Sequence, residues 1–127
     1  VCGGERDGAV MQPTLLDGAT TDMRVCREEL FGPAVSVMSI SGVDEAIRLA
    51  NDTEFGLSAG LFTKDIDAAV RFAREVDSGN IHINWGPLWR TDGMPYGGLK
   101  GSGIGKEGPK YAIDEMTEMK SVVIHSD

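Results

Sequence analysis

The sequence predicts an α/β fold of three layers, in which helices cover a mainly parallel sheet. Two helix-length segments, residues 43–51 and 65–76, alternate with short apolar segments that are rich in β-branched residues. The second helix repeats the chemistry of the first one 23 residues later. A strand–helix–strand–helix–strand order joins parallel strands by right-handed crossovers, so we expect a parallel sheet.

Both helices are predicted from apolar residues at helical spacing. The two apolar faces consist of Val43, Ala46, Ile47 and Ala50, and of Ile66, Ala69, Val70 and Ala73. Acidic residues open both helices, which suits the positive end of the helix dipole. Each face therefore forms a stripe that can pack against a sheet.

The remaining elements follow from short apolar runs and turn residues. We expect strands at residues 9–16, 34–40, 57–63, 80–84 and 120–124, and a last helix at residues 109–117. Pro13 has no backbone N–H, so its strand lies at an edge or bends there. The last strand has no evident neighbour, and an apolar strand with an open edge favours pairing with another chain.

Residues 84–108 form a long predicted loop in which eight of 25 residues are glycine. A loop of this length in a compact domain is usually functional. It follows the carboxyl end of a strand, where open α/β sheets bind ligands. Residues 103–108 match the pattern Gly-x-Gly-x-x-Gly, but no strand directly precedes them, so we reject a dinucleotide-binding fingerprint there.

Composition excludes several classes of function. The net charge of −8 disfavours binding to nucleic acid or to an anionic membrane. No apolar run approaches the length of a membrane span, and no signal peptide is visible at Val1. Two cysteines are too few for a disulfide framework, so we expect a reduced, cytoplasmic protein. His82 and His125 have no metal-ligand spacing, and no metal site is expected.

A thiol enzyme that uses Cys2 or Cys26 is one alternative. Cys26 precedes two carboxylates, whose negative charge disfavours a thiolate nucleophile, and Cys2 precedes a Gly-Gly turn. We therefore interpret both cysteines as structural or incidental. A non-enzymatic binding or assembly module is the other alternative, because the last strand is unpaired.

Residues 28–33 read Glu-Glu-Leu-Phe-Gly-Pro, in which Glu29 and Phe31 are two positions apart. On an extended segment such residues point the same way. A carboxylate accepts strong hydrogen bonds from two neighbouring hydroxyl groups, and a ring beside it supplies a flat apolar wall. This pair suits a ribose that carries an aromatic base. A surface acid beside a core phenylalanine is the structural alternative.

With residues 94–103, Met-Pro-Tyr-Gly-Gly-Leu-Lys-Gly-Ser-Gly, this motif resembles the C-terminal part of the aldehyde dehydrogenase superfamily. The resemblance covers nearly the whole chain. It implies that residues 1–117 are the C-terminal part of a catalytic domain and that residues 118–127 are a terminal oligomerisation strand. It also implies that Glu29 and Phe31 hold the nicotinamide ribose of NAD or NADP. The family's nucleophilic cysteine lies upstream, so no catalytic residue is expected in this chain.

The variable part of the glycine-rich loop is expected to contact the substrate. The candidates are Trp85, Trp89, Arg90 and Tyr96. Aromatic walls suit an apolar aldehyde tunnel, and the fork of Arg90 suits a carboxylate or phosphate. An exposed ion pair between Arg90 and Asp92 is the alternative. Glu107 is interpreted as a structural carboxylate at the start of the last helix.

The resemblance implies an oxidoreductase that converts an aldehyde to a carboxylic acid through a cysteine thioester, and we expect a small oxygenated or anionic aldehyde. Its expected partners are the aldehyde, the remainder of the same polypeptide and further copies in a dimer or tetramer, with no nucleic acid and no membrane. By itself this segment is expected to be inactive.

Overall fold

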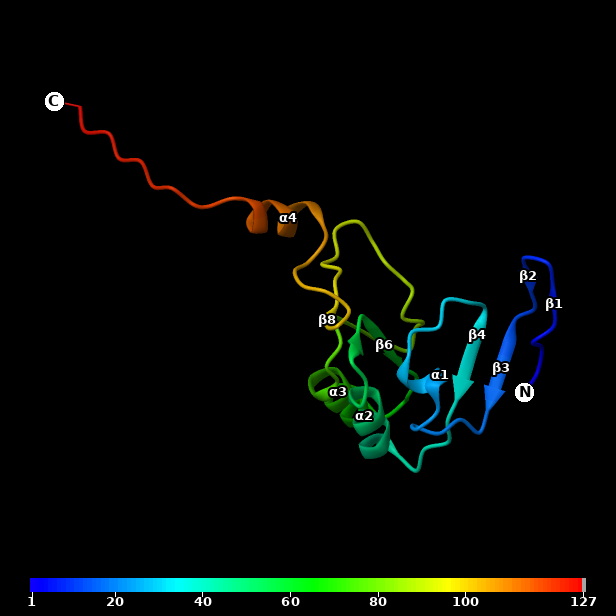
Figure 1. Cartoon of the computed structure of the whole chain (residues 1–127). Coiled ribbons are helices and arrows are strands. Elements are labelled where there is room, and N and C mark those ends of the chain that lie inside the picture. The colour runs from blue at the N-terminus through cyan, green and yellow to red at the C-terminus, as the bar shows by residue number, and fades with distance from the viewer. Residues whose placement is uncertain (127) are drawn as a thin grey trace. The chain divides into compact units, whose positions relative to one another are not determined.

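The computed structural model describes residues 1–126, which cluster into two compact units that divide between Glu54 and Phe55 (Figure 1). Asp127, the end of the predicted oligomerisation segment, lies outside the described residues. Within the described residues, no helix is long and apolar enough to cross a membrane.

The first unit contains a parallel pair of strands with two helices. Its elements in chain order are β1 (Arg6–Asp7), β2 (Val10–Met11), β3 (Thr14–Asp17), α1 (Arg24–Arg27), β4 (Ala34–Val37) and α2 (Val43–Asn51). β3 runs parallel to β4, with Thr14 opposite Ala34. β1 and β2 form an antiparallel hairpin through Gly8, whose φ of 58° lies in the region that glycine favours. The predicted strand at residues 9–16 is therefore two strands, because Pro13 interrupts it.

Helix α2 has the bounds that were predicted from the sequence, and it buries the predicted apolar face. Ile47 is buried, and Val43, Ala46 and Ala50 are half-buried. At its far end, Asp52 accepts two hydrogen bonds from the guanidinium of Arg27, at 3.0 and 3.1 Å. The hydrogen bond from Arg27 and its positive charge lower the pKa of Asp52. This ion pair joins α1 to the end of α2 inside the first unit.

The second unit repeats the pattern of a parallel pair around a helix. Its elements are β5 (Phe55–Gly56), β6 (Ser58–Leu61), α3 (Ile66–Glu75), β7 (Asn80–Ile83), β8 (Leu99–Lys100) and α4 (Pro109–Met116). β6 and β7 are parallel, with Ser58 opposite Asn80, and β5 and β8 are antiparallel. Since the four-residue strands of both units pair in parallel, the predicted α/β class with mainly parallel pairing is confirmed.

Helix α3 buries a different face from the predicted one. Ala69, Phe72 and Val76 are buried, whereas Ile66 and Val70 are 72% and 48% exposed. The ring of Phe72 has more apolar area than the alanine and valine side chains of the predicted face. The face that contains Phe72 is therefore the one that packs on β7. Of the four residues of the predicted face only Ala69 is buried, so the prediction was wrong for Ile66, Val70 and Ala73, although the helix itself was predicted correctly.

The side chain of Asp65 caps α3. Its Oδ1 accepts hydrogen bonds from the amides of Asp67 at 2.9 Å and Ala68 at 3.2 Å. Replacing Asp65 with alanine leaves these amides without that acceptor, and loss of such a cap typically costs about 1 kcal/mol. We expect hydrogen exchange at both amides to become roughly fivefold faster. Asp65→Asn keeps an acceptor and should exchange as the wild type does; equal exchange in all three proteins would contradict the capping role.

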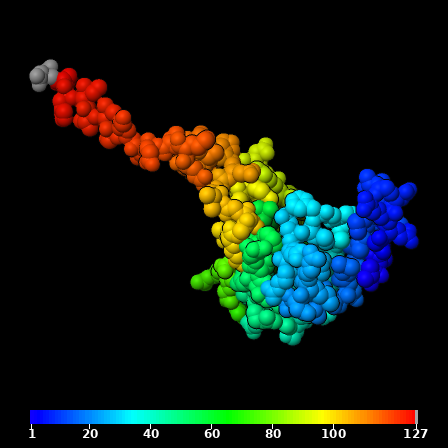
Figure 2. Space-filling model, viewed as in Figure 1, coloured from blue at the N-terminus to red at the C-terminus, as the bar shows by residue number. Residues whose placement is uncertain are grey.

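The last segment differs from its prediction. Residues 117–126 are all exposed, and the predicted strand at residues 120–124 has no hydrogen-bonded neighbour among the described residues, so no strand forms. Val122, Val123 and Ile124 are 72%, 72% and 86% exposed. Figure 2 shows the segment extending away from α4. The role of these residues between subunits stays a prediction.

Candidate functional site

The segment with Glu29 follows helix α1 in the first unit. Glu28 ends the helix, and its carboxylate forms two hydrogen bonds with the guanidinium of Arg24, both at 2.8 Å. These bonds lower the pKa of Glu28. Glu29 is exposed, and among the described residues its carboxylate has no hydrogen bond or ion pair. Of the two neighbouring carboxylates, the structure therefore leaves Glu29 available for a ligand.

The ring of Phe31 is exposed to solvent. Its side chain is 91% exposed, which is unusual for an aromatic ring in a folded unit. The segment is nevertheless anchored, because the amide of Thr14 donates to the Pro33 carbonyl at 2.8 Å. A shallow hollow of about 220 Å³ is lined by Glu29 and Leu30 together with α1, and Phe31 does not line it. The two predicted cofactor residues are thus both accessible but do not share this hollow.

The glycine-rich loop of the second unit begins with a sharp turn at Asn84. Its φ of 58° lies in the left-handed region, which asparagine tolerates better than most residues. Its Oδ1 accepts a hydrogen bond from the amide of Thr63 at 2.8 Å, and its own amide donates to Leu61 at 2.7 Å. The turn at the end of β7 is therefore fixed to β6, and the loop leaves the strands at a defined point.

Trp85 and Trp89 line one hollow with His82 and Ile83, of about 430 Å³. The rings of His82 and Trp89 meet edge to face, with centroids 6.4 Å apart. His82 is only 9% exposed, and its Nε2 is buried without a hydrogen-bond partner in the described residues. The two predicted substrate residues Trp85 and Trp89 therefore lie in one hollow. His82, which was not selected from the sequence, lines the same hollow.

Arg90 and Tyr96 form the second group. The guanidinium carbon of Arg90 lies 4.4 Å from the centroid of the Tyr96 ring, a cation–π distance. Its Nη2 also donates to Oε2 of Glu107 at 3.0 Å. The carboxylate that pairs with Arg90 is thus Glu107, and the predicted alternative of a pair with Asp92 is wrong. Glu107 is the residue of this group that sequence reasoning interpreted as structural.

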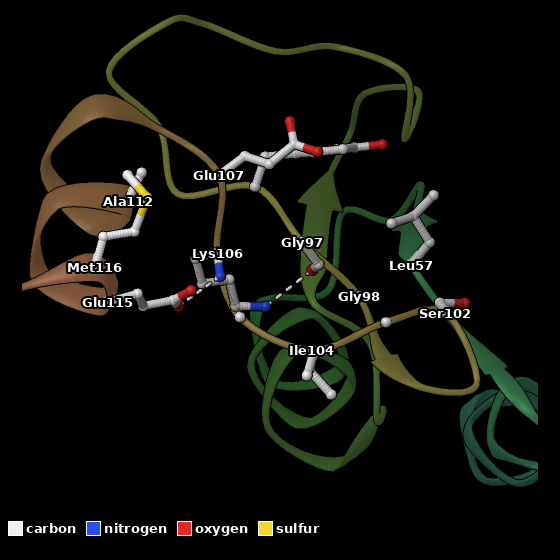
Figure 3. A pocket seen from close by; sticks show the side chains of 13 residues that line it. Leu57, Gly97, Gly98, Ser102, Ile104, Lys106, Glu107, Ala112, Glu115 and Met116 are labelled. Atoms are coloured by element: carbon white, nitrogen blue, oxygen red, sulfur yellow. Dashed lines mark hydrogen bonds between the residues drawn. The ribbon is translucent and has the colours of Figure 1, made fainter.

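A pocket of about 330 Å³ lies between the glycine-rich loop and helix α4 (Figure 3). It is lined by Leu57, by Tyr96, Gly97 and Gly98, by Ser102 to Glu107, and by Ala112, Glu115 and Met116. Lys106 holds two of its walls together. Its Nζ donates to the Gly97 carbonyl at 2.8 Å, and its amide donates to Oε1 of Glu115 at 2.9 Å. Tyr96 thus borders this pocket, whereas Trp85 and Trp89 line the other hollow.

Close backbone packing explains several of the loop glycines. A Cβ atom at Gly97 would lie 2.4 Å from the Gly105 carbonyl oxygen, and one at Gly98 would lie 2.6 Å from the Ser102 carbonyl oxygen. Neither glycine has a positive φ. Conformational freedom is instead the reason at Gly103 and Gly105, whose φ angles are 128° and 75°. The glycines therefore allow the loop to fold on itself.

The alternative of a thiol enzyme that uses Cys2 or Cys26 receives little support from the described residues. Cys2 is exposed, and Cys26 is half-buried with its Sγ 3.9 Å from the Ser36 hydroxyl, which is no base. Among residues 1–126, no group of three or more His, Cys, Asp or Glu side chains is placed to hold a metal ion.

The profile of the aldehyde dehydrogenase family matches residues 1–122. A 3-sulfolactaldehyde dehydrogenase of Priestia aryabhattai is 51% identical over 123 residues, which cover 97% of this chain and 26% of that protein. The chain spans about a quarter of the length of the curated relatives it matches.

Solved structures agree with that match. Glyceraldehyde-3-phosphate dehydrogenase of Methanocaldococcus jannaschii, complexed with NADP, is similar with a TM-score of 0.90 and 40% identity, over 98% of this chain and 27% of that one. Aldehyde dehydrogenase 21 of Physcomitrella patens, in complex with its product succinate, has a TM-score of 0.88 and 41% identity, over 93% of this chain and 24% of that one. The chain therefore folds like the corresponding quarter of these α/β enzymes.

Proposed function

Because the chain belongs to the aldehyde dehydrogenase family, we propose that it takes part in the NAD(P)-dependent oxidation of an aldehyde to a carboxylic acid. The overall reaction consumes the aldehyde, water and oxidised cofactor, and releases the acid, reduced cofactor and a proton. When bound, NAD or NADP would supply the hydride acceptor for this reaction. The nucleophilic cysteine that the family uses is supplied from outside the residues of this chain.

The observation that carries the proposal is the free carboxylate of Glu29, two positions before the exposed ring of Phe31. We propose that Glu29 accepts hydrogen bonds from the two hydroxyl groups of the nicotinamide ribose. Charge-assisted bonds of this kind are about twice as strong as neutral ones. Phe31 would then supply an apolar wall for the nicotinamide and lose its contact with water. The pair fits NAD and NADP equally, since both carry this ribose.

Trp85, Trp89, Arg90 and Tyr96 are proposed to line the path of the aldehyde. The hollow at the two tryptophans offers apolar walls, and Arg90 on the Tyr96 ring offers a cation. A small oxygenated or anionic aldehyde suits such a combination. The names of two similar proteins, a 3-sulfolactaldehyde dehydrogenase and a dehydrogenase with succinate as product, support an anionic substrate.

Residues 118–127 are proposed to pair with another subunit in a dimer or tetramer. Their exposed apolar side chains, Val122, Val123 and Ile124, support this role, because burying them against a partner is favourable. We place the protein in the cytoplasm, which suits its free cysteines.

The test is the formation of reduced cofactor by the complete protein with NAD or NADP, with succinic semialdehyde as the anionic aldehyde and butanal as its neutral counterpart. We expect cofactor reduction that depends on the aldehyde. No reduction with either cofactor and either aldehyde, by a folded protein, would contradict the proposed function.

Arg90→Ala should lower kcat/KM for succinic semialdehyde roughly 10- to 100-fold, because a charged hydrogen bond to the substrate is lost. Oxidation of butanal should change little. Arg74→Ala is a matched control, since Arg74 is an exposed arginine on α3 for which no ion pair is described. Equal losses for both aldehydes in Arg90→Ala would remove Arg90 from substrate recognition.

A further inference from the structure

The second unit holds the guanidinium of Arg90 between an aromatic ring and a carboxylate. The ring of Tyr96 lies 4.4 Å from the guanidinium carbon, and Oε2 of Glu107 lies 3.0 Å from Nη2. Arg90 and Glu107 are 17 positions apart in the sequence, so this contact depends on the fold of the loop.

The loop fixes the two groups that contact Arg90 relative to each other. Tyr96 and Glu107 form an isolated antiparallel bridge, in which the Tyr96 amide donates to Glu107 at 3.2 Å and the Glu107 amide donates to Tyr96 at 2.6 Å. Next to the bridge, Lys106 binds the Gly97 carbonyl. The ring and the carboxylate are therefore presented to Arg90 as one unit.

The ion pair is well placed but weak enough to be displaced. The side chains of Arg90 and Glu107 are 43% and 67% exposed, and exposed pairs contribute little to stability. The contact uses one N–H of a guanidinium, which carries five. A bound carboxylate can therefore form a bidentate pair with the remaining N–H groups, and such pairs are stronger. It would also meet the negative charge of Glu107 at close range.

We infer that Glu107 determines specificity: it keeps Arg90 on the Tyr96 ring and competes with the anionic group of the substrate for the same guanidinium. This inference rests on the proposed function, because it assigns a role within the proposed substrate site. Glu107 acts through Arg90, so it is a positioning residue. Its charge lowers the affinity for anions and narrows the preference for anionic over neutral aldehydes.

The decisive variant is Glu107→Gln in the complete protein. Glutamine keeps an oxygen that can accept from Nη2, but it removes the negative charge. One unit charge at about 4 Å in water is worth about a factor of five. We therefore expect the ratio of kcat/KM for succinic semialdehyde to kcat/KM for butanal to rise roughly fivefold. In an Arg90→Met background the same substitution should leave this ratio unchanged.

Asp92→Asn is the matched control. It removes one negative charge from the same loop, but Asp92 has no contact with Arg90 among those described. In the Asp92→Asn protein, the ratio of kcat/KM for succinic semialdehyde to kcat/KM for butanal should equal that of the wild type. Glu107 is exposed, so folding of the Glu107→Gln protein should be unaffected, and its melting temperature checks this.

Binding of succinate, measured by calorimetry, separates this inference from the proposed function. Glu107→Gln should bind succinate roughly fivefold more tightly than the wild type, and Arg90→Met should lose binding. If both aldehydes are oxidised but the ratio and succinate binding do not change, the inference is overturned and the proposed function stands. If no aldehyde is oxidised but succinate binding changes as expected, the proposed function and the role of Glu107 in aldehyde specificity fail, and only its competition with a bound anion for Arg90 stands. If neither occurs, both are overturned.

Discussion

Glu29→Gln in the complete protein is expected to lower kcat/KM for the cofactor roughly 10- to 100-fold. An ionised carboxylate can accept two charge-assisted hydrogen bonds from the ribose, each worth about 1.5–3 kcal/mol. Glutamine retains one acceptor and places an NH₂ group where the second acceptor was. Since Glu29 is exposed and has no described partner, the free energy of unfolding should change by less than about 0.5 kcal/mol.

Glu28→Gln is the control for this prediction. Glu28 is the adjacent carboxylate and carries the same charge, but the guanidinium of Arg24 already occupies it. Its substitution should leave the kinetic constants for NAD and NADP almost unchanged. An unaltered turnover and cofactor KM in Glu29→Gln, or equal losses in both variants, would refute the ribose contact.

Gly79→Ala is expected to have the largest effect on stability. A Cβ atom at this position would lie 1.7 Å from the Gly97 carbonyl oxygen and 2.8 Å from the Gly97 carbonyl carbon. Both neighbours are backbone atoms, so no side-chain rotation relieves the clash. It would also lie 3.0 Å from Nζ of Lys106, which binds the same carbonyl. The loop must move away from β7, and we expect a loss of about 3 kcal/mol or more.

Gly93→Ala provides the comparison for thermal or urea unfolding. Gly93 lies in the same loop, has no positive φ, and a Cβ atom there would meet nothing within 4 Å. We expect a change below about 0.5 kcal/mol for this variant. If Gly79→Ala unfolds at the same temperature as Gly93→Ala, the loop does not pack on the strand as described.

The three longer helices, α2 to α4, could be predicted from sequence because their signals are local, whereas the four-residue helix α1 was not predicted. Helix α2 has the predicted bounds, α3 is one residue shorter than predicted at each end, and α4 is one residue shorter at its C-terminal end. The buried face of α3 could not be predicted from spacing alone. The pattern counts apolar positions, whereas packing depends on the size of Phe72 and on the neighbouring strand β7.

Short strands and long-range pairs were missed for a related reason. β8 consists of two residues inside the glycine-rich loop, and it pairs with β5 more than 40 positions earlier. No periodicity can show in two residues. The segment at residues 120–124 has strand-like composition, but a strand also needs a hydrogen-bonded neighbour, and the described residues supply none.

Glu29 and Phe31 could be selected because their motif stands in one segment and resembles that of a known family. The structure leaves both side chains accessible, and their contact with the cofactor stays a prediction. Glu107 was not selected for the substrate group, because its contact with Arg90 exists only after the Tyr96 bridge has formed. A glutamate before a glycine at the start of a helix gives no hint of such a pair.

A structure of the complete protein with bound NAD or NADP is the most direct test of the proposed contact between Glu29 and the ribose. We expect both carboxylate oxygens of Glu29 to lie within hydrogen-bond distance of the nicotinamide ribose hydroxyl groups, with the ring of Phe31 against the nicotinamide. A ribose held by other residues, with Glu29 turned to solvent, would contradict it.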